Sequence, residues 1–290
     1  MARRLGLIGR GRWGRTIART LEEFPEVAVT PIGRGEARPA GLDGVIVATP
    51  SATHADLAMP YIQAGIATFI EKPMTTTDAD AARIAEAAAK SGAIVFVGHI
   101  HLHNPAFQAA LGVARTLGSV QAMLCEMANE RPAIPSSTLW EWLPHPLSMA
   151  RALLDGEADV VEAVTLAGAP GHEQAVIARF TFGAAPVWVS ANRVTPHAVF
   201  RASIACAGGT IIYDDRAERR LALHDRSGAV SYPAYDAEPP LTRELREFLR
   251  AIETGTRDPV QIETGRAIVR AIAAAERSVA QHGARVPIAP

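Results

Sequence analysis

The chain has 290 residues, of which 48% are hydrophobic and 20% are charged, and its formal net charge is −1. This balance is ordinary for a globular enzyme and gives no basic surface for nucleic acid or for an anionic membrane. Two distant cysteines, Cys125 and Cys206, suggest no disulfide framework, and no signal peptide or membrane-spanning run is evident, so we expect a cytoplasmic protein.

A glycine-rich turn follows the first predicted strand. Gly9, Gly11 and Gly14 have the spacing G-x-G-x-x-G between a short apolar run and a helix-compatible stretch. In dinucleotide-binding folds the first glycine makes a tight turn, the second admits the pyrophosphate and the third lets helix and strand pack closely. A plain glycine turn is the alternative, but the order of strand, turn and helix favours a dinucleotide site. Its expected residues are Gly9, Arg10, Gly11, Arg12, Trp13 and Gly14.

The tip of the second predicted strand, at residues 26–30, should select the cofactor. An acid at this position binds the ribose hydroxyls of NAD, whereas an arginine accommodates the 2′-phosphate of NADP. No acid stands at the expected place, which Arg34 occupies instead. Because a guanidinium pairs bidentately with phosphate, the sequence slightly favours NADP(H) over NAD(H), with a solvated loop arginine as the alternative.

Strands and helices alternate through the first hundred residues. Segment 35–44 is too short for a helix plus a strand, so we expect a sheet that is shortened after its second strand. Further strands are predicted at 45–50, 67–70 and 93–97, and helices at 14–23, 54–64 and 75–90. Thr75 and Asp78 resemble a capping box at the start of the last helix. The pattern predicts a Rossmann-type, doubly wound parallel sheet in a dinucleotide-binding domain at residues 1–98.

The pattern changes after residue 98. Strand-like runs follow one another with few helices, at 120–125, 160–166, 175–182, 187–191, 200–205 and 210–213. Helices are predicted at 145–154, 242–254 and 263–282. We therefore expect a second, α+β domain at residues 99–290, built on a large and mostly antiparallel open sheet, with the last helix able to pack back on the first domain.

Several motifs in this order resemble the glucose-fructose oxidoreductase, inositol dehydrogenase and rhizopine-catabolism (Gfo/Idh/MocA) oxidoreductase family. The likeness spans essentially the whole chain. The motifs are Gly9-x-Gly11-x-Trp13-Gly14, Ala48-Thr49-Pro50-Ser51-x-x-His54, Glu71-Lys72-Pro73, Trp140-Glu141 to His145-Pro-Leu-Ser148, and the ending from Pro240 to Phe248.

The resemblance implies a nicotinamide cofactor over the carboxyl ends of the first-domain strands. Beyond the glycine loop and Arg34, its implied binding residues are Thr49, Pro50, Ser51, His54, Glu71 and Lys72. The resemblance assigns catalysis to Lys72, Glu141 and His145, and it implies a homo-oligomer (dimer or tetramer) through the C-terminal sheet. Two departures stand out, because Glu141 replaces the usual Asp and Ser148 replaces a second Asp.

These residue types suit hydride transfer from a secondary alcohol. The oxygen must lose a proton to a general base and needs a positive group beside the developing alkoxide. His145 suits the first task because of its intrinsic pKa, and Lys72 suits the second. Glu141 could orient His145 if both lay on one helix, although Pro144 fits only the first turn of such a helix. A solvated Glu and a packed His are the alternatives.

Other residues are candidates for substrate contact. His99, His101 and His103 would share a face on a strand, but no carboxylate or cysteine stands at a ligand spacing, so we expect packing or pocket roles and no metal. Trp140 and Trp142 could line a sugar site or belong to the core. Asn129 and Arg131 are equally well placed for substrate or for a surface loop. The substrate-binding set is Lys72, His99, Asn129, Trp140 and His145.

The sequence thus predicts an NAD(P)-dependent oxidoreductase that acts on a hydroxyl or keto carbon of a sugar, cyclitol or nucleotide-sugar. Three alternatives remain on the same scaffold. They are a reductase of a C=N or tetrapyrrole-type substrate, a redox-neutral glycosidase that uses NAD, and a non-enzymatic NAD(P)-sensing regulator. The regulator would be expected to lose Lys72 or His145, and both are present.

Overall fold

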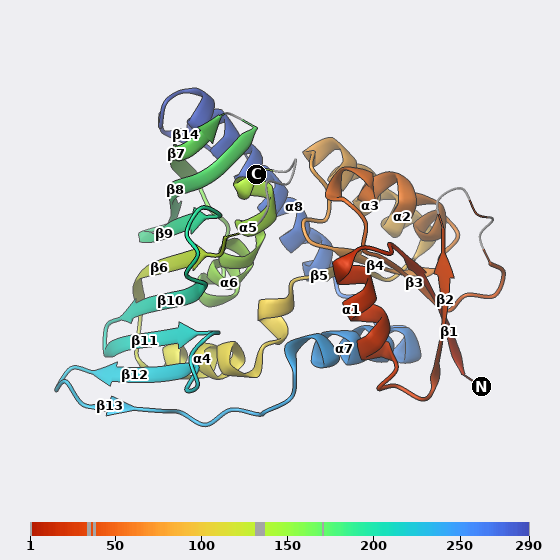
Figure 1. The fold of residues 1–290 in the computed structure, drawn as a ribbon, viewed down its shortest axis with the longest axis horizontal. Helices are drawn as coiled ribbons and strands as arrows, with labels where there is room; N and C mark the ends of the chain where they lie inside the picture. Colours follow the sequence, from red (N-terminus) through yellow and green to blue (C-terminus); the bar gives the residue numbers. More distant parts are fainter. Residues whose placement is uncertain (1, 34–35, 37–38, 131–136, 170, 290) are drawn as a thin grey trace. The chain divides into compact units, whose positions relative to one another are not determined.

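The computed structural model describes residues 2–33, 36, 39–130, 137–169 and 171–289. The chain forms two compact units (Figure 1), one of residues 1–100 and 238–269 and the other of residues 101–237 and 270–290. We expected one domain boundary, at residue 98. In the structure, residues 238–269 also belong to the first unit. A late segment of the chain therefore completes an early domain.

The first unit contains a five-stranded sheet in the order β2-β1-β3-β4-β5, in which every neighbouring pair is parallel. The predicted Rossmann-type sheet is confirmed. Because β2 and β3 lie on opposite sides of β1, the carboxyl ends of β1 and β3 open a crevice where such folds bind ligands. The strands are β1 (Arg3–Ile8), β2 (Val27–Ile32), β3 (Gly44–Val47), β4 (Ala67–Glu71) and β5 (Val95–Gly98).

Helices cover both faces of this sheet (Figure 1). α2 (His54–Gln63) and α3 (Asp78–Ser91) pack on one face, and α1 (Arg12–Leu21) and α7 (Pro240–Thr254) pack on the other. Phe69 and Phe96 stack with their ring centroids 5.3 Å apart, and Phe248 of α7 meets the Phe69 ring at 5.6 Å. Burial of such a ring is worth about 1.5–3 kcal/mol, which explains why α7 belongs to this unit.

The start of α3 corrects one expectation. Thr77 is the N-cap, because its hydroxyl oxygen accepts the backbone N–H of Asp80 at 3.1 Å. The capping box predicted at Thr75 and Asp78 is therefore two residues too early. Thr77 and Asp80 have the same spacing and satisfy a donor that the first turn would otherwise leave open.

The second unit contains a nine-stranded sheet in the order β13-β12-β11-β10-β6-β9-β8-β7-β14. Its pairs are antiparallel except for β6 and β9, which confirms the predicted mostly antiparallel sheet. The strands are β6 (Val120–Ala128), β7 (Val160–Ala169), β8 (His172–Phe182), β9 (Ala185–Asn192), β10 (Val199–Cys206), β11 (Gly209–Asp214), β12 (Leu221–Asp225), β13 (Val230–Ser231) and β14 (Val286–Pro287).

Helices of the second unit lie along one face of this sheet (Figure 1). They are α4 (Pro105–Thr116), α5 (Thr138–Trp142) and α6 (Pro144–Leu154), and α8 (Pro259–Ala280) runs through both units. Side chains alternate along β6, where Met123 and Cys125 are buried while Leu124 is 53% exposed. No helix in the described part of the chain is both long and apolar enough to cross a membrane.

Candidate functional site

The glycine turn after β1 is built from backbone contacts. Gly9 has φ +124°, and a Cβ there would lie 2.2 Å from the carbonyl oxygen of Ala48, after β3. A Cβ on Gly14 would lie 2.1 Å from the carbonyl oxygen of Gly9. Neither position can therefore hold a side chain. By contrast, no described atom lies within 4 Å of a Cβ on Gly11, the N-cap of α1, so the helix start is open to a phosphate group.

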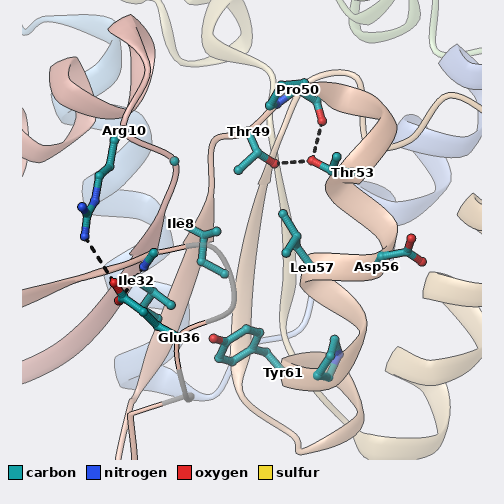
Figure 2. A pocket seen from close by; sticks show the side chains of 13 residues that line it. Ile8, Arg10, Ile32, Glu36, Thr49, Pro50, Thr53, Asp56, Leu57 and Tyr61 are labelled. Carbon is teal, nitrogen blue, oxygen red and sulfur yellow. Dashed lines mark hydrogen bonds and ion pairs between the residues drawn. The ribbon is translucent and has the colours of Figure 1, made fainter.

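A pocket of about 740 Å³ adjoins this turn (Figure 2). The ends of the first three strands supply its mouth, and α2 supplies an apolar wall that includes Leu57 and Tyr61. It therefore lies at the crevice between β1 and β3 and has the size and apolar lining of a site for a small planar ligand. The lining residues are Ile8, Gly9, Arg10, Ile32, Gly33, Glu36, Thr49, Pro50, Thr53, Asp56, Leu57, Pro60 and Tyr61.

A carboxylate stands at the tip of β2, which overturns the expectation that no acid is present there. Glu36 lines the pocket, and its Oε2 accepts the backbone N–H of Gly33 at 2.7 Å. Arg10 lies across from it, 3.8 Å from Oε1 (Figure 2). The strand extends to Ile32, two residues beyond the predicted end. Arg34 itself lies outside the described residues.

The ends of β3 and β4 are joined by a buried histidine. The His54 Nδ1 lies 2.9 Å from the carbonyl oxygen of Pro73, and Nε2 lies 2.9 Å from that of Thr49. Burial lowers the pKa of His54, and the nearby Lys72 charge lowers it further, so the ring is neutral at pH 7. His54 was predicted to bind the cofactor, but both of its nitrogens face main-chain carbonyls and its ring is 1% exposed.

The strand end that carries Lys72 has unusual electrostatics. Glu71 is buried and accepts the indole N–H of Trp13 and, at 3.2 Å, the backbone N–H of Lys72. Burial raises the pKa of Glu71 to about 7, even though the Trp13 hydrogen bond and the Lys72 charge both lower it. Burial also raises the pKa of Glu244 on α7, and the Glu71 carboxylate raises it further. Lys72, half-buried and followed by a cis peptide bond to Pro73, thus sits beside the Glu71 carboxyl, whose pKa is raised.

In the second unit, His145 and Glu141 do not share a helix. Glu141 belongs to α5, and His145 belongs to α6, which begins at Pro144. Proline has no N–H for the helix ladder, so it begins a new helix instead of continuing the old one. The expected one-helix arrangement of the two side chains is therefore wrong.

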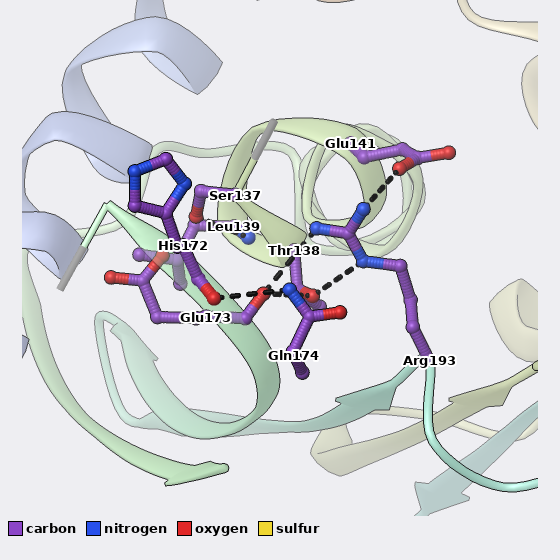
Figure 3. A network of polar contacts seen from close by, with 8 residues as sticks. All are labelled: Ser137, Thr138, Leu139, Glu141, His172, Glu173, Gln174 and Arg193. Carbon is purple, nitrogen blue, oxygen red and sulfur yellow. Dashed lines mark hydrogen bonds and ion pairs between the residues drawn. The ribbon is translucent and has the colours of Figure 1, made fainter. Parts of the chain in front are cut away.

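Glu141 is instead held by a buried arginine (Figure 3). Arg193 donates from Nη1 to Glu141 Oε2 at 3.1 Å and from Nε to Thr138 Oγ1 at 2.9 Å. Its Nη2 donates to the carbonyl oxygen of Glu173 at 3.3 Å. Arg193, which stands just past the end of β9, was not predicted from the sequence. A charged donor this deep needs such partners, and charge-assisted pairs of this kind fix the geometry of a carboxylate.

The other candidate residues take varied positions. Trp140 is buried and donates its indole N–H to Glu276, as expected of a core residue. Asn129 follows β6, where its backbone N–H donates to Asn192. Ser51 begins a short 3-10 turn, and Arg12 is exposed at the start of α1. Arg131 lies outside the described residues.

The three alternating histidines do not lie on a strand. His99 directly follows β5, and His101 and His103 belong to a 3-10 turn at Ile100–His103. All three are buried. Within the described part of the chain, no group of three or more His, Cys, Asp or Glu side chains is arranged to hold a metal ion.

Comparison with known proteins extends these observations. A family model described as an oxidoreductase family with an NAD-binding Rossmann fold matches residues 36–99. An inositol 2-dehydrogenase of Rhizobium meliloti is 26% identical in an alignment that covers 97% of this chain and 98% of that protein. A solved structure of an oxidoreductase from Magnetospirillum magnetotacticum is 29% identical, with a TM-score of 0.85. The match covers 94% of this chain and 99% of that one.

The chain is therefore similar to the Gfo/Idh/MocA oxidoreductase family, whose model matches residues 36–99. Another relative, an inositol 2-dehydrogenase of Acidothermus cellulolyticus, is 29% identical, but the alignment covers only 56% of this chain and 56% of that protein. The resemblance to this family is thus confirmed, and the matched residues include the Thr49 and Lys72 motifs. An NAD-binding Rossmann fold is a property of the family, and the pocket and glycine turn described above are compatible with it.

The structure generates a contrast between two glycines of the turn. Replacing Gly11 with Val should abolish binding of the nicotinamide nucleotide, because the new side chain would fill the space where a phosphate approaches the α1 amides. The melting temperature should stay near that of the wild type, since the unliganded protein has room for it. Isothermal titration calorimetry with NADH and a thermal melt measure the two effects.

Gly14→Ala provides the matched control. It should destabilise the fold by several kelvin or more, because its methyl group would meet the Gly9 carbonyl. Undiminished nucleotide affinity in Gly11→Val would contradict a phosphate site at this turn.

Proposed function

We propose that this protein is an NAD-dependent dehydrogenase that transfers a hydride between nicotinamide and a hydroxyl-bearing ring carbon of a cyclitol or sugar. The observation that carries the proposal is the open helix start at Gly11, set between two glycines that backbone contacts make obligatory and beside an apolar pocket. The names of the two relatives, both inositol 2-dehydrogenases, support a cyclitol as the first substrate to test.

The residues around the pocket fit an adenine nucleotide. The apolar wall from Leu57 and Tyr61 suits a base, and the amides that follow Gly11 suit a pyrophosphate. When bound, nicotinamide supplies the hydride acceptor or donor. We propose that seven residues contact this cofactor or border its site: Arg10, Arg12, Trp13, Thr49, Pro50, Ser51 and Glu71. His54 stabilises the site through its hydrogen bonds to the carbonyl oxygens of Thr49 and Pro73.

Lys72 and His145 supply the proposed acid–base chemistry. His145 takes the hydroxyl proton as the carbon loses its hydride, because an imidazole can change charge near neutral pH. The Lys72 ammonium stabilises the oxygen while negative charge develops on it. Glu141, fixed by Arg193, supplies a carboxylate that hydrogen-bonds a substrate hydroxyl. His99 and Asn129 remain candidates for further substrate contacts, and Trp140 contributes through the core.

Glu36 supports NAD(H) as the cofactor in place of the slight preference for NADP(H) drawn from Arg34. A carboxylate at the tip of β2 can accept hydrogen bonds from both ribose hydroxyls of NAD. The same charge would repel the 2′-phosphate of NADP. Because Glu36 already lines the pocket and is oriented by the Gly33 N–H, little reorganisation is needed for this contact.

The sheet of the second unit supports a homo-oligomer. Leu124 and Trp188 are neighbours on β6 and β9 and are 53% and 43% exposed, on the face opposite the buried Met123 and Cys125. Val164 and Leu166 of β7 add further exposed apolar surface. Exposed apolar side chains on a sheet face support an interface there. We propose that a second copy of the chain covers this face.

The catalytic roles predict a large loss of turnover with retained cofactor affinity. Lys72→Ala and His145→Ala should each lower kcat for myo-inositol oxidation by about two orders of magnitude or more, the size expected for loss of an acid–base or charge-stabilising group. NADH formation measured at 340 nm reports the rate, and calorimetry reports the cofactor Kd.

Matched controls exist for both substitutions. Lys90, the only other lysine, pairs with Glu86 on the surface of α3, so Lys90→Ala should leave kcat unchanged, as should His172→Ala at an exposed position. Near-normal turnover in Lys72→Ala or His145→Ala would remove the role assigned to that residue. Cleavage of an added glycoside with no net NADH would instead indicate the redox-neutral glycosidase.

Cofactor selection should depend on Glu36. Glu36→Gln should weaken NAD binding about tenfold, or about 1.4 kcal/mol, because a neutral amide binds the ribose hydroxyls less well. It should also strengthen NADP binding, since the repulsion of the 2′-phosphate is lost. Glu26→Gln, an exposed carboxylate just before the opposite end of β2, is the control. Tighter binding of NADP than of NAD by the wild type would refute this assignment.

The oligomer proposal predicts dissociation on placing a charge in the exposed sheet face. Trp188→Glu should convert the wild-type assembly into monomers, as measured by size-exclusion chromatography with light scattering, because it removes a large apolar contact and burying a charge in its place is costly. Val260→Glu, at an exposed apolar position on α8, should leave the assembly intact. A monomeric wild-type protein would end the proposal.

A further inference from the structure

A hydrogen-bonded chain of side chains runs through the second unit. The Nδ1 atom of His101 lies 3.1 Å from the hydroxyl oxygen of Tyr213, and that hydroxyl lies 3.4 Å from Oδ1 of Asp215. The amide of Asn104 donates to the same carboxylate oxygen at 3.0 Å. His101 is 8% exposed and Tyr213 is fully buried, so the chain leads from the interior to a partly exposed acid.

The direction of the chain follows from its protonation states. Burial raises the pKa of Tyr213, and the Asp215 charge raises it further, so the phenol keeps its proton. That proton is donated to the Asp215 carboxylate, which Arg220 supports at 3.9 Å. The phenol oxygen then serves as an acceptor, and His101 donates to it from Nδ1. A neutral His101 is therefore held as the Nδ1–H tautomer.

The His101 ring also contacts the ring of His145. The two imidazole rings are nearly perpendicular, at 83°, with their centroids 5.0 Å apart. His101 is also stacked on Phe200, with centroids 3.9 Å apart and planes within 10°. Phe200 in turn meets the His145 ring at 6.0 Å. His101 is thus fixed by a stack and by a hydrogen bond, and it forms part of the surface against which His145 rests.

We propose that His101, together with Tyr213 and Asp215, is a positioning group that fixes the ring of His145 and favours its protonated form. This inference rests on the proposed role of His145 as the general base. A chain of donors that ends in an anion stabilises positive charge at its other end, since each hydrogen bond polarises the next. The His101 ring, polarised in this way, would support through its ring contact the imidazolium formed when His145 accepts a substrate proton, and a fixed ring keeps the base aimed at one oxygen.

The other ionisable groups near the hydrogen-bonded side chains leave the negative charge at the Asp215 end. Burial raises the pKa of Asp215, and the nearby Arg220 and Arg216 partly offset this rise. Cys125 on β6 interacts with Tyr213, but burial raises the pKa of this thiol to about 12, so it is neutral at pH 7. Asp215 is therefore the negative group at the end of the chain.

The tautomer of His101 tests the inference without any enzyme assay. In protein labelled with 15N-histidine, long-range 1H–15N spectra distinguish the two neutral tautomers, and His101→Gln identifies the signals of that residue. The expected result is Nδ1–H in the wild type and a mixture of tautomers in Tyr213→Phe, which removes only the hydroxyl. An Nε2–H tautomer in the wild type would overturn the inference whether or not the protein is a dehydrogenase.

Kinetics give the second test. Tyr213→Phe and Asp215→Asn should each lower kcat by about tenfold, the scale of a slightly misplaced catalytic group, while the Kd for NADH stays within about twofold. The acidic limb of the pH profile should move to lower pH in both variants, because His145 loses support for its protonated form. Tyr232→Phe, which alters an exposed tyrosine on the segment after β13, is the matched control and should change neither.

The two proposals fail in different ways. If Lys72→Ala and His145→Ala are inactive while Tyr213→Phe and Asp215→Asn retain the wild-type kcat and pH profile, the dehydrogenase proposal stands and the positioning role is refuted. If Tyr213→Phe is too unstable to assay, the wild-type tautomer and Asp215→Asn still decide the matter.

Discussion

The first unit depends on one close approach of main chain to main chain. Gly9 lies against the Ala48 carbonyl, and Gly14 lies against the Gly9 carbonyl, each closer than any side chain would permit. This contact sets the angle at which α1 leaves β1, and so it determines where the unpaired amides of the helix point. The pocket, the tip of β2 and the ends of β3 and β4 are all arranged around that turn.

Buried charge plays the corresponding role in the second unit. Arg193 is fully enclosed, so each of its donors needs an acceptor, and Thr138, Glu141 and the Glu173 carbonyl provide them. Leaving such a group unpaired would cost several kcal/mol, so the three acceptors must stay within hydrogen-bond distance of the guanidinium. α5 is thereby fastened to β8 and β9, and the Glu141 carboxylate has a defined place although its helix is only five residues long.

The sequence was most informative where chemistry is local. Gly9, Gly11 and Gly14 follow directly from spacing, and the strand that ends just before Lys72 follows from an apolar run. Glu36 was missed because a strand end was misplaced by two residues, which moved the cofactor-selecting position. Arg193 and Tyr213 could not be found, since their partners Glu141 and His101 are far away in sequence and only folding brings them together. The return of α7 to the first unit is equally non-local.

His54 has a consequence for how ligand binding reaches the reactive end of the site. Its ring hydrogen-bonds the carbonyl oxygens of both Thr49 and Pro73, so it connects the loop after β3 to the loop after β4. Any displacement of the Thr49 loop by a nucleotide must be shared with the residue next to Lys72. We therefore expect nucleotide affinity and the placement of the ammonium to be thermodynamically linked, so that a change that favours one arrangement of Lys72 would also change how tightly the nucleotide is held.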